Sequence, residues 1–424
     1  MRAPAAMAHA TLVGSDPPDL CSPVAVPRSL PGDPRCATGV VLPGVPSAVR
    51  LTFNEPVELV GRGVRVLAPT GRRVDRGPAR ASGSVVTMPL DPAGAGTYVV
   101  VWRVIARDTH PSQGIFAFSV GRPSVPAGGA VTAASQGAGS ISGLILQVAA
   151  RALHLIGYAL SFGVLAFRQT VLRSLGLAAG ADVNRRIWRL VGIGVLALLI
   201  AEPLALVAQT SSLGAGTRGP LDPEAIGDVL DSSFGRVLAQ RLGAALLLWV
   251  LVGATGTGPD RAVGAALLLG VAVACIDGQA AHAAGARPEW LGLGLNTLHV
   301  AAMGAWVGGV VGLLGVWRIG SLAARRRQIA VRTGRVAIAS LAVLAGTGTG
   351  MAAQHLAGIS SLFNTTYGRA LAAKLGVLLV AAALAWAATH APEDRRRAWW
   401  VREAAALLAV LALAGLLASL PPPV

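Results

Sequence analysis

The sequence predicts an N-terminal all-β domain, a Greek-key barrel or sandwich, followed by an all-α polytopic membrane domain with eight transmembrane helices. Hydrophobic residues make up 53% of the 424 positions and charged residues only 13%, which is too apolar for a soluble fold of this size. Short alternating runs separated by Gly and Pro fill the first part of the chain, and long apolar stretches fill the remainder.

The first residues carry a cleavage pattern. Ala6-Met7-Ala8 has the A-x-A form of a signal-peptidase site and stands directly before His9. We therefore expect residues 1–8 to be the remnant of a signal peptide. Cleavage there would give His9 a free α-amine beside its imidazole. The alternative is that these small residues stand there by chance.

A β-domain is expected over residues 9–122 and a flexible linker, rich in Gly, Ala and Ser, over 123–140. Cys21 and Cys36 lie in a Pro-rich insertion of this domain. We expect them to form a disulfide in an oxidising compartment, and the alternative is two free thiols. Five alternating runs predict strands, at 49–53, 63–67, 84–90, 97–105 and 114–120.

The membrane domain is expected over residues 141–424. Eight apolar stretches are long enough to cross a hydrocarbon layer of ~30 Å. They lie at 143–166, 188–208, 237–254, 262–281, 291–316, 332–352, 370–388 and 403–420.

Arginines predict the orientation of these spans. The loops after the first, third, fifth and seventh spans hold sixteen arginines and the opposite loops hold five. By the positive-inside rule, the β-domain and the C-terminus are extracytoplasmic, in a multi-pass protein of a bacterial plasma membrane. The net charge of +16 therefore reflects contact with the lipid bilayer and gives no reason to expect a nucleic-acid partner.

Three residues of the β-domain offer metal ligands. Asp108 and His110 alternate by two, so on extended backbone they point to one face. With the His9 imidazole and its amine they would supply enough nitrogen and oxygen donors for a tetragonal Cu(II) site. An Asp-x-His pair in a loop is otherwise most often a hydrogen-bonded turn.

The β-domain resembles the copper-binding CopC family. The likeness rests on five segments, His9-Ala10-Thr11-Leu12, Ser15-Asp16-Pro17, Leu51-Thr52-Phe53-Asn54-Glu55-Pro56-Val57, Gly96-Thr97-Tyr98 and Asp108-Thr109-His110-Pro111. In that family an N-terminal His, an Asp and a second His bind Cu(II). The resemblance implies that His9, Asp108 and His110 do so here. The Cys21 to Cys36 insertion departs from the family pattern.

Polar side chains in the spans predict a second set of copper ligands, because lipid-facing helices tolerate such groups at high cost. His154 lies about 16 Å along the first predicted span and His299 about 12 Å along the fifth. His282 and His355 fall at the outer ends of the fourth and sixth spans, so all four imidazoles belong to the outer half of the membrane.

Two methionines stand one helical turn from a histidine, Met303 after His299 and Met351 before His355. Imidazole and thioether suit Cu(I), although methionine also fills apolar cores. Three further residues are interpreted as a pathway. We expect Glu202 either to serve a cation path or proton relay, or to pair with an arginine or Lys374. Asp277 is expected to line an outer vestibule near His282. Lys374 is the only lysine of the sequence.

The membrane part resembles the CopD family of membrane copper proteins. The likeness rests on Leu298-His299-Val300-Ala301-Ala302-Met303-Gly304-Ala305-Trp306, on Thr366-Tyr367-Gly368-Arg369-Ala370-Leu371-Ala372-Ala373-Lys374 and on the eight-span layout. The resemblance implies copper handling at the plasma membrane, with copper as Cu(II) in the β-domain and as Cu(I) or Cu(II) in the membrane domain.

The leading hypothesis is copper capture outside and transport inward, because every predicted ligand lies on the outer side. One alternative is a haem- or copper-dependent electron-transfer or cupric reductase protein, in which His154 and His299 would ligate haem. Another is copper delivery to a neighbouring extracytoplasmic protein without conduction. No hydrolase or ATP-binding motif stands in the sequence, so an enzyme is not expected.

Overall fold

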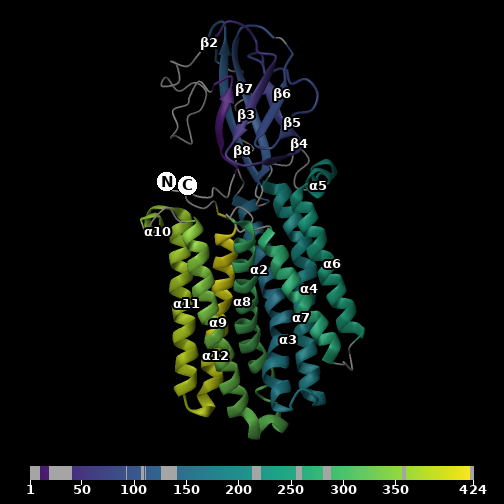
Figure 1. The fold of residues 1–424 in the computed structure, drawn as a ribbon, viewed down its shortest axis with the longest axis vertical. Helices are drawn as coiled ribbons and strands as arrows, with labels where there is room; N and C mark the ends of the chain where they lie inside the picture. The colour runs from purple at the N-terminus through teal and green to yellow at the C-terminus, as the bar shows by residue number, and fades with distance from the viewer. Residues whose placement is uncertain are drawn as a thin grey trace. The chain divides into compact units, whose positions relative to one another are not determined.

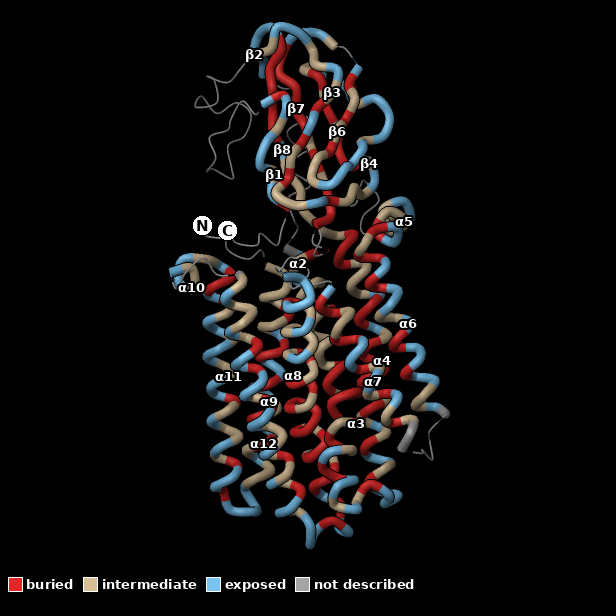
Figure 2. The backbone as a smooth tube through the Cα atoms, viewed as in Figure 1, coloured by how far each residue is buried: buried red, intermediate tan, exposed pale blue. Residues whose placement is uncertain are grey.

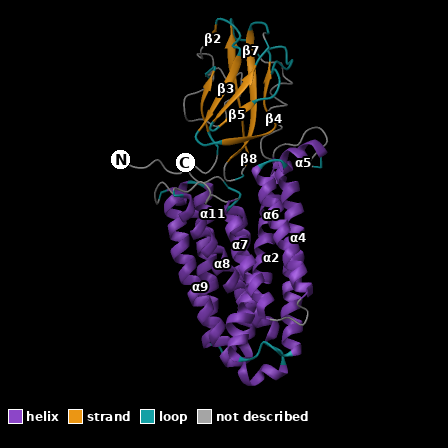
Figure 3. Ribbon diagram, turned by 45° about the vertical axis from the view of Figure 1, so that its right-hand side comes forward, coloured by secondary structure: helices purple, strands orange, loops and turns teal. Residues whose placement is uncertain are grey.

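The computed structural model describes residues 10–18, 41–91, 93–106, 109, 111–125, 141–212, 221–254, 260–279, 288–355 and 360–420. These residues divide into two compact units. One unit holds the chain up to Leu144 together with Leu206–Arg236, and the other holds Ile145–Ala205 and the chain from Val237 onward. Figure 3 separates the strands, in orange, from the helices, in purple.

The strands form two four-stranded sheets. One has the order β1-β3-β6-β5, with bounds Leu12–Asp16, Ala48–Phe53, Val85–Pro89 and Arg80–Ser82. The other has the order β2-β8-β7-β4, with bounds Val41–Leu42, Pro111–Val120, Gly96–Ala106 and Val57–Leu67. Neighbouring strands are antiparallel except β2 and β8. Phe53 from one sheet meets Trp102 from the other edge to face, with ring centroids 5.1 Å apart. The predicted sandwich and its five strands are confirmed.

Strand β4 is longer than predicted because a bulge interrupts its alternation. Its pairing with β7 shifts between Leu59 and Val64. Gly61 and Gly63, inside the bulge, have φ of 59° and 60°, in the left-handed region that only glycine adopts at little cost. The alternation therefore restarts at Gly63, where the sequence placed the start of the strand.

Two contacts extend the strand-bearing unit beyond its sheets. Ser124 lies inside the predicted linker, yet its backbone donates to Thr97 Oγ1 and its hydroxyl accepts from Thr97 N, both at 2.9 Å. Glu58 accepts from Ser233 N at 2.7 Å and from Arg236 at 2.9 Å. Burial raises the pKa of the Glu58 carboxyl, but the hydrogen bonds from Ser233 and Arg236 outweigh burial and hold the pKa below its usual 4.5.

Eight helices among the described residues are long and apolar enough to cross a membrane, as predicted (Figure 1). The first span is a composite of α2 (Ile141–Tyr158), the π-helix η2 (Ala159–Gly163), α3 (Val164–Phe167), η3 (Arg168–Leu172) and η4 (Arg173–Leu175). The others are α4 (Ala181–Ser212), α6 (Ser233–Ala254), α7 (Asp260–Gln279), α8 (Glu289–Val316), η6 with α9 (Gly320–Arg325, Arg326–His355), α11 (Thr366–His390) and α12 (Glu393–Leu417). Two short helices, α5 (Pro223–Leu230) and α10 (Ser361–Asn364), complete the set.

Most arginines that the sequence assigned to loops lie on helix ends. Arg185 and Arg186 belong to α4, and Arg395 belongs to α12. Arg236 and Arg241, assigned to an outer loop, belong to α6. The expected loops were too long because hydropathy marks only the part of a helix that lies in hydrocarbon, and helices continue into water.

The first and fifth spans form the centre of the bundle. Their most apolar segments are 56% and 61% buried, against 6% for the seventh span. Figure 2 shows the same contrast between α8 and α11. Glycines permit this packing, because a Cβ at Gly163 would overlap the backbone of Gly304 and Gly308 in α8. His154 lies two helical turns before this contact.

Candidate functional site

The predicted Cu(II) ligands His9, Asp108 and His110 lie outside the described residues, as do Cys21, Cys36 and His282. Thr109 is described and has φ of 66°, and its N–H donates to Ala106 O at 3.0 Å. The chain therefore turns at Thr109, between β7 and β8, and the extended backbone assumed there is wrong. The alternation argument that placed Asp108 and His110 on one face no longer applies.

Helix α4 holds this turn. Gln209 is buried, and its Nε2 donates to the Thr109 carbonyl at 3.1 Å. A left-handed conformation is unfavourable for a β-branched residue by about 1–2 kcal/mol. Such backbone persists where its surroundings fix it, and the hydrogen bond from Gln209 does so at Thr109.

Three buried polar residues and a half-buried arginine, from four helices, meet inside the membrane domain. His154 of α2 has Nδ1 2.7 Å from Glu202 Oε1 of α4. Its Nε2 lies 3.2 Å from both carboxylate oxygens of Asp277 of α7. Arg241 Nε of α6 lies 2.8 Å from Asp277 Oδ1 as an ion pair. His154, Glu202 and Asp277 are all less than a tenth exposed, so this part of the network is closed to bulk water, whereas the Arg241 side chain is 16% exposed.

The network accounts for two predicted pathway residues. Glu202 pairs with His154, rather than with an arginine or Lys374. Asp277 is buried beside the same imidazole, and His282, near which it was expected to line a vestibule, lies outside the described residues. The aliphatic context of each helix gave no sign that these residues would meet, because the meeting depends on how four helices are rotated in the bundle.

The charges of the network favour a cation. Both ring nitrogens of His154 face carboxylates, so both can donate only when the imidazole carries a second proton. Glu202 Oε2 is buried without a hydrogen-bond partner among the described residues. An unsatisfied carboxylate oxygen in a closed site is costly, and a proton or a metal ion beside it would lower that cost.

His299 has a different environment. Its Nδ1 lies 2.9 Å from Thr347 Oγ1 of α9, and the neighbouring charge is the Lys374 ammonium of α11. A cation at His299 would be repelled by Lys374, whereas a cation at His154 would be attracted by two carboxylates. The sequence treated the two histidines alike, and the structure separates them by charge.

The remaining predicted ligands are placed as follows. Met303 is buried on α8, one turn after His299, and Met351 is half-buried on α9. His355 ends α9, and its side chain is outside the description. No group of three or more His, Cys, Asp or Glu side chains within the described ranges is arranged to hold a metal ion.

Sequence reasoning missed two residues that lie inside the bundle, Glu403 and Arg241. Glu403 of α12 is 2% exposed and accepts from Trp306 Nε1 of α8 at 2.9 Å. Glu403 stands at the first position of the predicted eighth span, directly after Arg402, and no role was predicted for it. Arg241 was assigned to a loop. A polar residue at the margin of an apolar stretch is the only signal that the sequence offers.

Two family models match the chain. The model described as CopC domain matches residues 34–121, and the model described as copper resistance protein D-like, N-terminal domain, matches residues 141–292. The chain belongs to the CopC/CopD fusion family of copper-resistance proteins. The predicted family and fold class are confirmed.

Individual proteins are similar over one or both parts. The copper transport protein CutJ of Bacillus subtilis (strain 168) is 25% identical over 416 residues, which is 90% of this chain and 72% of that protein. Copper resistance protein C of Xanthomonas campestris pv. juglandis is 30% identical over 118 residues, 27% of this chain and 82% of that protein. The crystal structure of CopC from Methylosinus trichosporium OB3b matches with 24% identity and a TM-score of 0.21, covering 27% of this chain and 95% of that chain.

Proposed function

We propose that this CopC/CopD fusion captures copper with its β-domain and transports it inward across the plasma membrane, with His154 and Asp277 as a transient ligand pair in the membrane domain. One observation carries the proposal. A buried imidazole lies between two carboxylates inside a bundle of membrane-spanning helices. Such groups are expensive in a membrane and are kept where they serve a substrate or ion path.

The geometry of the pair suits an ion that must also leave. The 3.2 Å between His154 Nε2 and the Asp277 oxygens is close to the separation of two ligands that each lie ~2.0–2.2 Å from one divalent ion. The Glu202 carboxylate would then accept a hydrogen bond from the His154 Nδ1–H and so orient the ring, as carboxylates do for metal-binding histidines. Two protein ligands hold an ion weakly, which conduction requires.

The collecting end of the route is the β-domain. His9, Asp108 and His110 are proposed to hold Cu(II), as the CopC resemblance implies, and His282, His355 and Met351 to receive it at the membrane surface. Copper then passes His154 and Asp277, as Cu(II), or as Cu(I) where an electron donor outside this chain has reduced it first. His299 and Met303 are assigned a secondary place, because Lys374 disfavours a cation at His299.

The direction rests on topology. The arginine asymmetry of the spans supports an extracytoplasmic β-domain and C-terminus by the positive-inside rule. The proposed ligands then all lie between the outer surface and the middle of the membrane. A collecting domain outside and a ligand set in the outer half of the membrane suit uptake.

Cellular copper content tests the direction. Cells lacking the protein, grown in limiting copper, are expected to accumulate less copper than cells that carry it, and re-expression should restore the content. Higher copper in the deletion strain would reverse the assignment to export. Equal copper, together with loss of metal from an extracytoplasmic copper enzyme, would support delivery without conduction.

Haem ligation is the alternative that the structure favours least. An axial histidine needs a free ring nitrogen, and both nitrogens of His154 face carboxylates. Absorption spectra of the purified protein decide this point, since a Soret band that depends on His154 and His299 would replace the copper route with electron transfer.

A further inference from the structure

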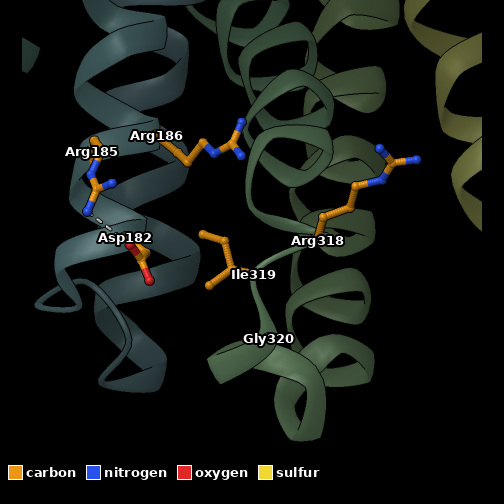
Figure 4. A pocket seen from close by; sticks show the side chains of 6 residues that line it. All are labelled: Asp182, Arg185, Arg186, Arg318, Ile319 and Gly320. Atoms are coloured by element: carbon orange, nitrogen blue, oxygen red, sulfur yellow. Dashed lines mark hydrogen bonds and ion pairs between the residues drawn. The ribbon is translucent and has the colours of Figure 1, made fainter.

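A pocket of about 250 Å³ lies where the start of α4 faces the turn between α8 and η6. Asp182, Arg185 and Arg186 of α4 form one wall, and the segment Arg318-Ile319-Gly320 forms the other. Figure 4 shows Arg185 turned to Asp182, Arg186 extended toward the α8 side, and Arg318 extended from the opposite wall away from α4. The pocket is therefore a basic one built from two sequence-distant elements.

Two of its three arginines lack an acidic partner. Arg185 is paired with Asp182 at 3.1 Å. Arg186 and Arg318 make no ion pair with any carboxylate in the part of the chain that the structure describes. Nearby arginines are engaged elsewhere: Arg326 donates to the Trp317 carbonyl at 3.0 Å and lies over its ring. The pocket thus has an excess of positive charge that no carboxylate within the described ranges balances.

The charged end of α4 continues into an apolar stripe. Ile193 and Ile200 follow Arg186 at intervals of seven residues, which keeps all three on one face of the helix. Ile193, Leu196 and Ile200 are about half exposed, although they stand in a membrane-spanning helix. This face of α4 therefore meets lipid, and Arg186 stands at its end, where lipid phosphates lie.

We propose that the pocket binds the phosphate headgroup of an anionic membrane lipid, with an acyl chain along Ile193, Leu196 and Ile200. Guanidinium groups match phosphate oxygens in bidentate geometry, and basic pockets between spans suit such headgroups. Helix α4 begins at Ala181, next to Asp182 of the pocket, and the first N–H groups of a helix have no partner within that helix. The inference does not depend on the copper route, and in the proposed topology the lipid belongs to the cytoplasmic leaflet.

Lipid retention by the full-length protein tests this site. The detergent-solubilised protein is mixed with phosphatidylglycerol or with phosphatidylcholine of identical acyl chains. The detergent is then removed in the mass spectrometer, and the lipid molecules that remain bound to each protein are counted. Phosphatidylglycerol should be retained in preference to phosphatidylcholine. Arg186→Gln should weaken that retention about fivefold. Arg318→Gln should weaken it less, because the Arg318 side chain extends away from α4. Arg186→Lys keeps the charge and should retain most of the binding.

Arg395→Gln is the matched control, because Arg395 is an exposed arginine at the start of α12 and outside the pocket. It should leave lipid retention unchanged, and all variants should unfold at the wild-type temperature. Equal retention of the two lipids, or an equal loss in Arg395→Gln, would overturn the proposal. So would binding of inorganic phosphate alone with the same dependence on Arg186, because the site would then serve a soluble anion.

Discussion

His154 Nδ1 and Glu202 Oε1 lie 2.7 Å apart, in the interior of a membrane-spanning bundle, although the two residues are 48 positions apart in the chain. Asp277 closes the other side of the imidazole, and Arg241 balances the second carboxylate. This buried network is the feature on which the proposed copper route depends, and its residues give different expectations when they are changed one at a time.

Replacing His154 should remove copper from the membrane domain, whereas replacing His299 should not. His154→Gln takes away the imidazole that lies between Glu202 and Asp277, and His299→Gln changes a site that Lys374 already makes unfavourable for cations. Copper bound per chain, measured on purified full-length protein at equilibrium, should fall in the first variant only. A fall in bound copper in both variants, or only in His299→Gln, would contradict the different roles assigned to His154 and His299.

Glu202 and Asp277 should differ in the size of their effects. Glu202→Gln keeps an oxygen acceptor for His154 Nδ1 but loses the charge, so copper affinity should fall about tenfold. Asp277→Asn removes a proposed ligand and leaves Arg241 unpaired, so its loss should be larger. Competition with a copper chelator measures both affinities. An order opposite to this one would assign the ligand role to Glu202.

The Trp306 to Glu403 hydrogen bond should stabilise the bundle. Trp306→Phe leaves a buried carboxyl without its indole donor and should cost about 1–3 kcal/mol of unfolding free energy. Glu403→Gln keeps an acceptor for the indole N–H and should cost less. Denaturant unfolding in detergent measures both variants, with Trp249→Phe, an exposed indole on α6, as the control. An equal effect of Trp249→Phe would show that the hydrogen bond has no specific role.

Glu58 should make one contact of the strand-bearing unit dependent on pH. Its pKa lies below the usual 4.5 in the folded protein because its hydrogen bonds from Ser233 and Arg236 outweigh burial. The carboxylate therefore contributes stability above about pH 4.5, and this contribution is lost as the pH falls through the lowered folded pKa. Glu58→Gln should melt at a lower temperature than wild type at neutral pH, and the gap should close under acid conditions. A gap that is constant with pH would mean that the charge of Glu58 is not involved.

The sequence was sufficient to predict the architecture, because the spacing of apolar residues along the chain reflects which side chains are buried. Alternation predicted β7 and β8, and apolar length predicted all eight spans. It was insufficient at Gly61 and Gly63, where a bulge breaks the period, and at Thr109, where a left-handed residue turns a segment that was expected to be extended.

The candidate site was predicted only in part. His154, Glu202 and Asp277 were each singled out as polar groups in apolar spans, since lipid penalises such groups wherever the helices point. Their meeting, and the addition of Arg241, depend on helix rotation and depth, which a single sequence does not encode locally. For the same reason the pairing of Glu403 with Trp306 was not foreseen.

Copper flux into proteoliposomes measures most directly whether copper crosses the membrane domain past His154. Vesicles containing the full-length protein should take up copper faster than empty vesicles, and His154→Gln should abolish the difference while Arg395→Gln preserves it. Undiminished flux through a correctly folded His154→Gln protein would contradict the account, because copper would then cross the membrane domain without the imidazole between Glu202 and Asp277.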